Sequence, residues 1–178
     1  MMKTFRSTQH PAKQAVRAAV AWSLWLFALN LVWEFAQLPL YAISPKVEWP
    51  VLVYAVLHCT LGDAAIAFVA YLIAASLTRD PQWPIGRPMM GLAVVLVAGE
   101  VFTVWAEWYN VYVLRSWAYA AGMPTIRGIG VAPLAQWLVL PVLAVAILRY
   151  RCRQGIEVKE RSLTRHESNA QDLPPFVP

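Results

Sequence analysis

The sequence predicts an all-α integral membrane protein, a bundle of four transmembrane helices with both termini in the cytoplasm. Three observations support this fold class. Apolar residues make up 59% of the 178 residues and charged residues only 14%, a composition typical of membrane proteins. Four apolar stretches each reach the roughly 20 residues that a spanning helix needs. The Lys and Arg residues gather on one side of these stretches, as the positive-inside rule requires.

The predicted spans divide the chain into three parts. We expect a basic cytoplasmic segment at residues 1–15, a transmembrane domain at residues 16–150 and a basic, then disordered cytoplasmic tail at residues 151–178. The spans are expected at about 16–43, 51–77, 89–114 and 131–148. The first span is longer than the apolar core of a signal peptide, so we expect it to be retained. The tail ends in DLPPFVP, whose composition cannot bury enough apolar area to become ordered.

Basic residues set the orientation of the spans. They occur before span one, in the loop RDPQWPIGRP between spans two and three, and after span four. The opposite side carries only Lys46, Arg115 and Arg127. Both termini are therefore expected in the cytoplasm, with the first and third loops outside. Topology also explains the net charge of +5, so we do not expect nucleic-acid binding.

The third loop, SWAYAAGMPTIRGIG, is long and too apolar for a solvated linker. We expect it to fold back onto the membrane surface. The two cysteines, Cys59 and Cys152, lie in span two and in the cytoplasmic tail. Since the membrane separates them, no disulfide is expected.

Five ionisable side chains lie inside the predicted spans. A charged side chain at the bilayer centre costs at least about 2.5 kcal/mol, so such residues usually face the bundle interior and have a function. The five are Glu34, His58, Asp63, Glu100 and Glu107.

Two of the spans carry polar residues at helical spacing. In span one these are Asn30, Glu34, Gln37 and Tyr41, and in span three Glu100, Thr103, Glu107 and Asn110. Steps of three or four residues place each set on one helical face. Lipid cannot satisfy such a face, so both are expected to turn inward.

The helical rise predicts the depth of each polar residue. Glu34, His58, Glu107 and Gln136 each lie about 8 to 10 Å below the outer ends of their helices, one from each span. A second layer, roughly 17 to 20 Å down, contains Asn30, Asp63 and Glu100. This arrangement predicts a pocket that opens to the outside and has a polar floor.

Aromatic and basic residues surround this predicted pocket. Trp33, Trp105, Trp108 and Trp137 lie near the carboxylates, where they either line the pocket or pack in the core. Trp49, Trp83 and Trp117 lie at the ends of the spans and predict aromatic belts. Arg115 and Arg127 are expected at the rim, where they would hold an anionic headgroup.

A structural role remains open for several of these polar residues. Asn30, Gln37 and Gln136 also suit interhelical hydrogen bonding without a ligand. Asp63 is placed to hydrogen-bond Asn30 or Glu100, and a buried pair with Glu100 would keep one carboxyl protonated. Structural carboxylates at positions 34 and 107 would need basic partners, and the nearest are His58 and the two rim arginines.

The ligand class favoured by this set is small and apolar or amphipathic. Glu34, His58 and Glu107 are the candidate residues for acid–base catalysis on a lipid-soluble substrate. Binding candidates are Asn30, Gln37, Asp63, Glu100, Asn110, Gln136, Trp33, Trp108, Arg115 and Arg127. Whether the protein is an enzyme stays open, and no phosphate loop or cofactor fingerprint names a cofactor.

Three alternatives use the same residues. One alternative is a metal held by Glu34, His58 and Glu107, although the spans contain one histidine and no Glu-x-x-His pair. Proton or ion transport would use the carboxylates as a ladder, but the cytoplasmic half of the spans lacks polar residues. An accessory subunit would pair its carboxylates with a membrane partner or a second copy.

Four sequence motifs resemble those of a known group of proteins. They are N-x-x-W-E-F-x-Q-L-P-L-Y from Asn30, H-C-T-L-G-D from His58, E-W-Y-N from Glu107 and W-A-Y-x-x-x-M-P from Trp117. Together they resemble a group of small bacterial inner-membrane proteins to which no activity is assigned. The resemblance implies the membrane fold and a location in the bacterial inner membrane, and it implies no reaction.

Overall fold

Four long helices make up most of the chain in the computed structural model, which describes residues 11–44 and 46–171. They are α1 (Pro11–Gln37), α2 (Trp49–Thr78), α3 (Pro88–Trp108) and α4 (Val131–Gln171). A 3-10 turn, η1 (Leu38–Leu40), extends α1, and a π-helical turn, η2 (Tyr109–Leu114), extends α3. The last loop contains a two-stranded antiparallel hairpin, β1 (Thr125–Ile126) and β2 (Ile129–Gly130).

Each of the four helices is long and apolar enough to cross a membrane, which indicates a multi-pass membrane protein. Prolines lie in the first turns of α2 and α3, where a missing backbone N–H costs no hydrogen bond. α2 ends at Arg79, whose left-handed backbone (φ 54°) lets its N–H reach the last carbonyls of the helix. The starts of α2, α3 and α4 and the end of α2 lie within two residues of the expected bounds, whereas α1 begins and ends about five residues early and α4 continues well past its expected end.

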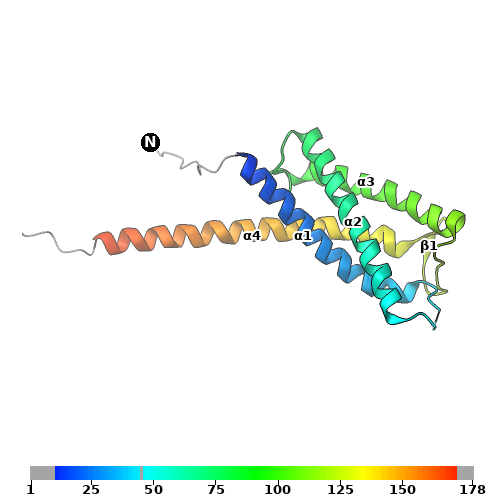
Figure 1. Ribbon diagram of the computed structural model, residues 1–178. Helices are drawn as coiled ribbons and strands as arrows, with labels where there is room; N and C mark the ends of the chain where they lie inside the picture. The colour runs from blue at the N-terminus through cyan, green and yellow to red at the C-terminus, as the bar shows by residue number, and fades with distance from the viewer. Residues whose placement is uncertain (1–10, 45, 172–178) are drawn as a thin grey trace, which may run out of the picture.

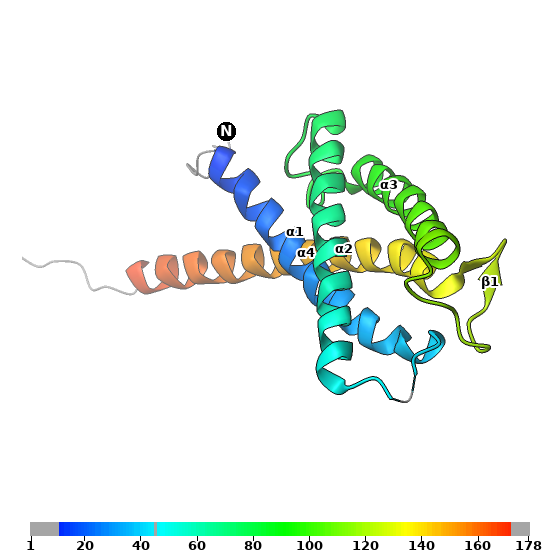
Figure 2. The ribbon, with the colours of Figure 1, turned by 45° about the vertical axis from the view of Figure 1, so that its right-hand side comes forward.

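The helices pack in cyclic order, α1 against α2, α2 against α3, α3 against α4, and α4 back against α1. The start of α1 and the α2–α3 loop lie toward one end, here called the termini end (Figure 1). The α1–α2 connection and the β hairpin lie at the other, the hairpin end. Figure 2 shows α2 and α3 spreading apart from their connecting loop toward the hairpin end.

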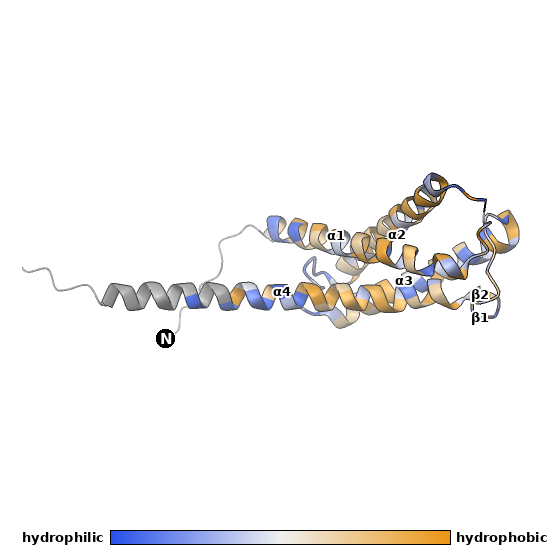
Figure 3. Ribbon diagram, turned by 90° about the horizontal axis from the view of Figure 1, so that it is seen from below, coloured by the Kyte–Doolittle hydropathy of each residue, from blue (hydrophilic) through white to orange (hydrophobic). Residues whose placement is uncertain are grey.

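The termini half of the molecule contains a close-packed apolar core. Trp22 is fully buried, donates its indole N–H to the Ala67 carbonyl at 3.1 Å, and meets Trp83 edge-on with ring centroids 5.0 Å apart. Gly91 of α3 leaves room for the Trp83 ring, because a Cβ there would overlap it. Apolar residues dominate the middle of the helices (Figure 3).

The expectation that Trp83 belongs to an interfacial aromatic belt is wrong. Its side chain is 0% exposed. The loop after α2 turns back at residues 79–87, and Tyr71 fixes it by donating its hydroxyl to the Pro81 carbonyl. This turn inserts the indole between helices, where it closes the core at the termini end.

The tail also differs from the expectation. We expected disorder after Arg153, but α4 continues as a helix to Gln171. Residues 151–171 contain four Arg, three Glu and no proline, and these residue types are compatible with a helix that continues beyond the apolar span. The final DLPPFVP and most of the basic N-terminal segment lie outside the described residues.

The loop between η2 and α4 folds back onto the end of α1. The Ala42 N–H donates to the Ala118 carbonyl at 2.8 Å, and the Ala120 N–H donates to the Leu40 carbonyl at 3.0 Å. Tyr41 and Tyr119 form the isolated β-bridge between these bonds. The loop is thereby fixed across the hairpin end of the helices.

Candidate functional site

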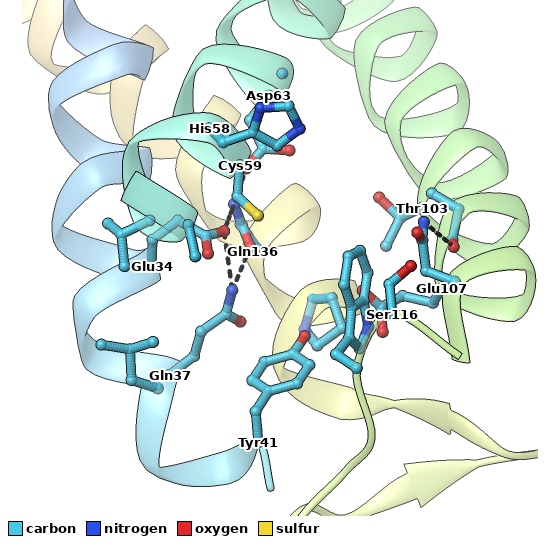
Figure 4. Close-up of a pocket in the computed structure, with 18 of the residues that line it drawn as sticks. Glu34, Gln37, Tyr41, His58, Cys59, Asp63, Thr103, Glu107, Ser116 and Gln136 are labelled. Carbon is cyan, nitrogen blue, oxygen red and sulfur yellow. Dashed lines mark hydrogen bonds between the residues drawn. The ribbon is translucent and has the colours of Figure 1, made fainter. Parts of the chain in front are cut away.

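A cavity of about 750 Å³ lies at the hairpin end. All four helices and the folded-back loop contribute to its lining, which includes the polar residues labelled in Figure 4. Between the spread ends of α2 and α3 its wall is apolar and includes Val51, Phe102 and Trp105. Trp137 forms its deep end, packed on Gly99 of α3. The cavity thus has a polar inner wall and an apolar opening.

Gln136 of α4 joins three helices through its side-chain amide. Its Nε2 donates to Asn30 Oδ1 on α1 and to Asp63 Oδ2 on α2, both at 2.7 Å. Glu34 Oε1 lies 3.4 Å from the same nitrogen. Asn30 is in turn anchored by its own amide, which donates to the Leu26 carbonyl. An amide nitrogen carries only two hydrogens, so three acceptors share two protons.

Glu34 and Gln37 form the next layer on α1. The Gln37 amide donates to Glu34 Oε1 at 2.9 Å, and its nitrogen lies 3.5 Å from Gln136 Oε1. Both side chains are buried, with 9% and 6% exposed. The spacing of three residues on one helical turn allows this bond. The amide oxygen of Gln37 has no hydrogen-bond partner and points toward the centre of the cavity in Figure 4.

Glu107 lies on the opposite wall, on α3. Its Oε2 accepts a 2.6 Å hydrogen bond from the Tyr119 hydroxyl, whose oxygen accepts from the Gly130 N–H at 2.9 Å. Burial of Tyr119 and its bond to Glu107 raise the pKa of this phenol. Burial, with Glu107 and Glu34 close by, also raises the pKa of Tyr41. Both phenols therefore keep their protons and serve as donors in the cavity.

The side chains that donate hydrogen bonds to Glu34 and Glu107 are neutral amides and a phenol, and neither carboxyl has a basic partner among them. Glu34 is held by the amides of Gln37 and Gln136, and Glu107 by the phenol of Tyr119. We expected a structural carboxylate to need a basic partner. The short amide and phenol side chains supply donors without a second buried charge, which avoids a further desolvation cost.

His58 lines the cavity from α2. Its side chain is exposed, and its ring stacks on Tyr54 of the same helix with centroids 5.9 Å apart. In Figure 4 it lies with Cys59 and Asp63 along α2. Among the described residues, no group of three or more His, Cys, Asp and Glu side chains could hold a metal ion. The weak alternative of a metal on Glu34, His58 and Glu107 therefore has no geometric support.

The structure brings some predicted residues together and not others. Glu34, Gln37, His58, Asp63, Glu107, Asn110 and Gln136 line the cavity. Asn30 lies behind Gln136 and joins the same network. Glu100, Trp33, Trp108, Arg115 and Arg127 are outside the lining.

The residues outside the cavity have identifiable positions. Trp33 packs against the apolar core, and Trp108 is half exposed on the outer surface of α3. Arg115 ends η2 and Arg127 lies in the hairpin turn, both exposed and both with left-handed backbone. The expected role of these arginines in holding an anionic headgroup is not supported, since neither reaches the cavity. Glu100 follows Gly99, whose missing Cβ leaves room for the Trp137 ring, and it is outside the cavity lining.

Sequence reasoning missed the contribution of the loop. Trp117, expected in an aromatic belt, and Ser116 line the cavity, and Tyr119 holds Glu107. The sequence pattern W-A-Y marks these residues, but only the pairing of the loop with the end of α1 brings them to the site.

No protein family, no curated protein and no solved structure matches this chain. The resemblance to small bacterial inner-membrane proteins rests on its motifs alone.

Proposed function

We propose that this chain is a four-helix bundle of the bacterial inner membrane that binds a small apolar or amphipathic ligand in its cavity. In this proposal both termini lie in the cytoplasm and the hairpin end faces the periplasm. The distribution of Lys and Arg in the sequence supports this orientation.

The observation that carries the proposal is a cavity of about 750 Å³ to which all four helices contribute. Its volume lies within the range of small-molecule sites, which combine apolar walls with a few polar groups. Its apolar opening lies between α2 and α3, beside exposed apolar residues such as Val51, Phe102 and Trp105. A ligand dissolved in the bilayer could enter there without crossing water.

The cavity also contains groups suited to proton transfer, which is the reaction type we propose if the ligand is transformed. Glu34 is held by amides, and Glu107 by a phenol. Two carboxyl groups in different surroundings are the usual basis for dividing the acid and base roles. His58 lines the same cavity and adds a third group able to exchange protons.

The test fills the cavity with a side chain. Gly62 lines the cavity, and a Cβ built there meets nothing within 4 Å. Native mass spectrometry of the detergent-purified protein should show a bound lipid-soluble molecule, or binding of added apolar probes, which Gly62→Leu reduces. Gly155→Leu is the matched control, since Gly155 is also helical with open space, but lies on the α4 extension. Equal binding by both variants would exclude this cavity as the site.

A second candidate function, an accessory subunit, is favoured by Glu100. One of its carboxylate oxygens is buried without a hydrogen-bond partner, and the residue lies outside the cavity. Such a group on an apolar helix fits a polar contact with a partner chain. If so, Glu100→Gln would release a co-purifying membrane protein, whereas Glu34→Gln would not.

The third alternative, transport of protons or ions across the membrane, has less support than ligand binding. The described termini half is filled by packed aromatic and aliphatic side chains, among them Trp22, Tyr71 and Trp83. A path from the cavity through this core would require the helices to rearrange.

A further inference from the structure

We propose that the ligand of this cavity carries a protonated amine, which binds between Gln37 and Glu34 while an apolar tail lies in the opening between α2 and α3. This inference rests on the proposed function and names the chemical class of the ligand. It follows from a count of donors and acceptors, from one unpartnered buried oxygen and from the charge of the lining.

The inner wall has more acceptors than amide N–H donors. Five oxygen-bearing side chains meet there, those of Asn30, Glu34, Gln37, Asp63 and Gln136. The Gln136 amide nitrogen lies within hydrogen-bonding distance of three acceptors, and the Gln37 amide nitrogen of two. The carboxyls of Glu34 and Asp63 are neighbours, so a proton held between them supplies one further donor. The amide oxygen of Gln37 still has no partner, and a ligand that donates a hydrogen bond to it would complete this wall.

Gln37 shows where that donor would bind. Its side chain is 6% exposed, lines the cavity, and leaves its Oε1 with no hydrogen-bond partner. The amide cannot simply turn over, because its nitrogen serves Glu34 at 2.9 Å. In Figure 4 the free oxygen points into the cavity, and the nitrogen of the same amide is turned toward Glu34. An incoming N–H group would meet the amide oxygen and the neighbouring carboxylate together.

The lining favours a positive charge over a negative one. Three carboxyl groups line the cavity, from Glu34, Asp63 and Glu107, and none of the Lys and Arg residues in the described chain does. An anionic headgroup would therefore enter without a counter-charge in a region of low dielectric. An ammonium group would gain charge-assisted hydrogen bonds there. The rings of Tyr41 and Trp117, edge-on to each other with centroids 6.5 Å apart, also line the cavity and can accept a cation over their faces.

Glu107 does not compete for this role. Its Oε2 accepts the Tyr119 hydroxyl at 2.6 Å, and the unpartnered buried atom beside that wall is a donor, the indole Nε1 of Trp117, whereas the unpartnered atom on the α1 side is an acceptor. The polar head is therefore assigned to the α1 side. The tail is assigned to the apolar opening, where Leu52, Phe102 and Trp105 line the cavity.

The experiment compares three probes of equal chain length at pH 7, namely decylamine, decanol and decanoate. Dissociation constants are measured for the detergent-purified full chain by titration, with the partition of each probe into empty micelles subtracted. We expect decylamine to bind at least about tenfold more tightly than either other probe. Glu34→Gln and Gln37→Leu should reduce this preference to less than about threefold, and Glu100→Gln should leave it unchanged.

Each outcome is informative. Retained decanol binding by Glu34→Gln shows that this variant is folded and its cavity intact. If decanol binds as tightly as decylamine to the native chain, or if Glu34→Gln keeps the amine preference, the amine assignment is wrong while the cavity function stands. If none of the three probes binds, the proposed function fails together with this inference.

Discussion

A single side-chain amide connects three helices of this protein. Gln136 is 3% exposed, and its Nε2 serves Asn30, Asp63 and Glu34. Leucine has similar volume and no donor, so it would leave those acceptors buried without one. Each orphaned acceptor costs about 1–3 kcal/mol.

We therefore expect Gln136→Leu to lower the thermal unfolding midpoint in detergent by several degrees, followed by tryptophan fluorescence. Gln154→Leu on the same helix is the control, because the Gln154 amide donates to the Tyr150 hydroxyl at an exposed position. If Gln136→Leu unfolds at the same temperature as the control, the hydrogen bonds of the Gln136 amide do not contribute to stability.

The hydroxyl of Tyr119 should make the free energy of unfolding decrease as the pH rises into the alkaline range. Burial and the bond to Glu107 raise its pKa, so the folded protein keeps this proton above about pH 10, where an unfolded tyrosine loses it. The folded state then binds more protons than the unfolded state, and stability falls as pH rises from there. Below this range the contribution is constant.

For Tyr119→Phe we expect a lower unfolding midpoint at neutral pH, because Glu107 and the Gly130 N–H lose a partner. We also expect a shallower decline of the midpoint above pH 10 than in the native chain, measured across a pH series. An identical alkaline decline in both proteins would contradict this assignment.

Part of the site could be predicted from the sequence. The four residues expected at one depth, Glu34, His58, Glu107 and Gln136, all line the cavity. The second expected layer is not separate from the first, because Asn30 and Asp63 both accept hydrogen bonds at 2.7 Å from the Gln136 amide. Glu100, expected in that second layer, does not line the cavity. The helical rise gives the height of each backbone position, but not the reach of a long side chain or the rotation of its helix.

Among the elements, the contact of α3 with α4 depends on a glycine. A Cβ at Gly99 would overlap the Trp137 ring, and this ring is also the deep end of the cavity. Adding a methyl group to a close-packed interior typically destabilises a protein by about 1–3 kcal/mol.

Gly99→Ala is therefore expected to lower the unfolding midpoint and to weaken probe binding, because the indole must shift toward the cavity. Gly62→Ala makes the same chemical change on α2 where nothing lies within 4 Å, so it should be neutral or slightly stabilising through helix propensity. Equal midpoints for the two alanine variants would show that α3 and α4 have room to adjust.

The helices themselves were well predicted from the sequence. The span expected at 51–77 is α2 at Trp49–Thr78, and the prolines that begin helices were visible in advance. The α4 extension was not predicted, because the polar composition after Arg153 was taken as disorder, whereas α4 continues to Gln171. The buried position of Trp83 was also missed, since a turn after α2, rather than any periodicity, places it.

For the whole molecule, the proposed orientation follows from the basic residues of the termini end. A reporter that is fluorescent only in the cytoplasm should fluoresce when fused after residue 178, and a phosphatase active only in the periplasm should be inactive there. Fusion of the same pair into the loop around Gly122, where added groups meet nothing within 4 Å, should give the reverse result. The opposite pattern would invert the orientation and place the cavity on the cytoplasmic side.

The central claim is that polar residues from all four helices enclose a space open to a ligand, and Cys59 reports on it directly. Cys59 lines the cavity, three residues before Gly62 on the same face of α2. In a Cys152→Ser background it is the only cysteine, so the rate of its alkylation by N-ethylmaleimide can be measured by mass spectrometry. We expect steady labelling that Gly62→Leu slows severalfold and Gly155→Leu leaves unchanged. Equal labelling rates in all three proteins would contradict the claim, because Cys59 would then be reached from the lipid and not through the cavity.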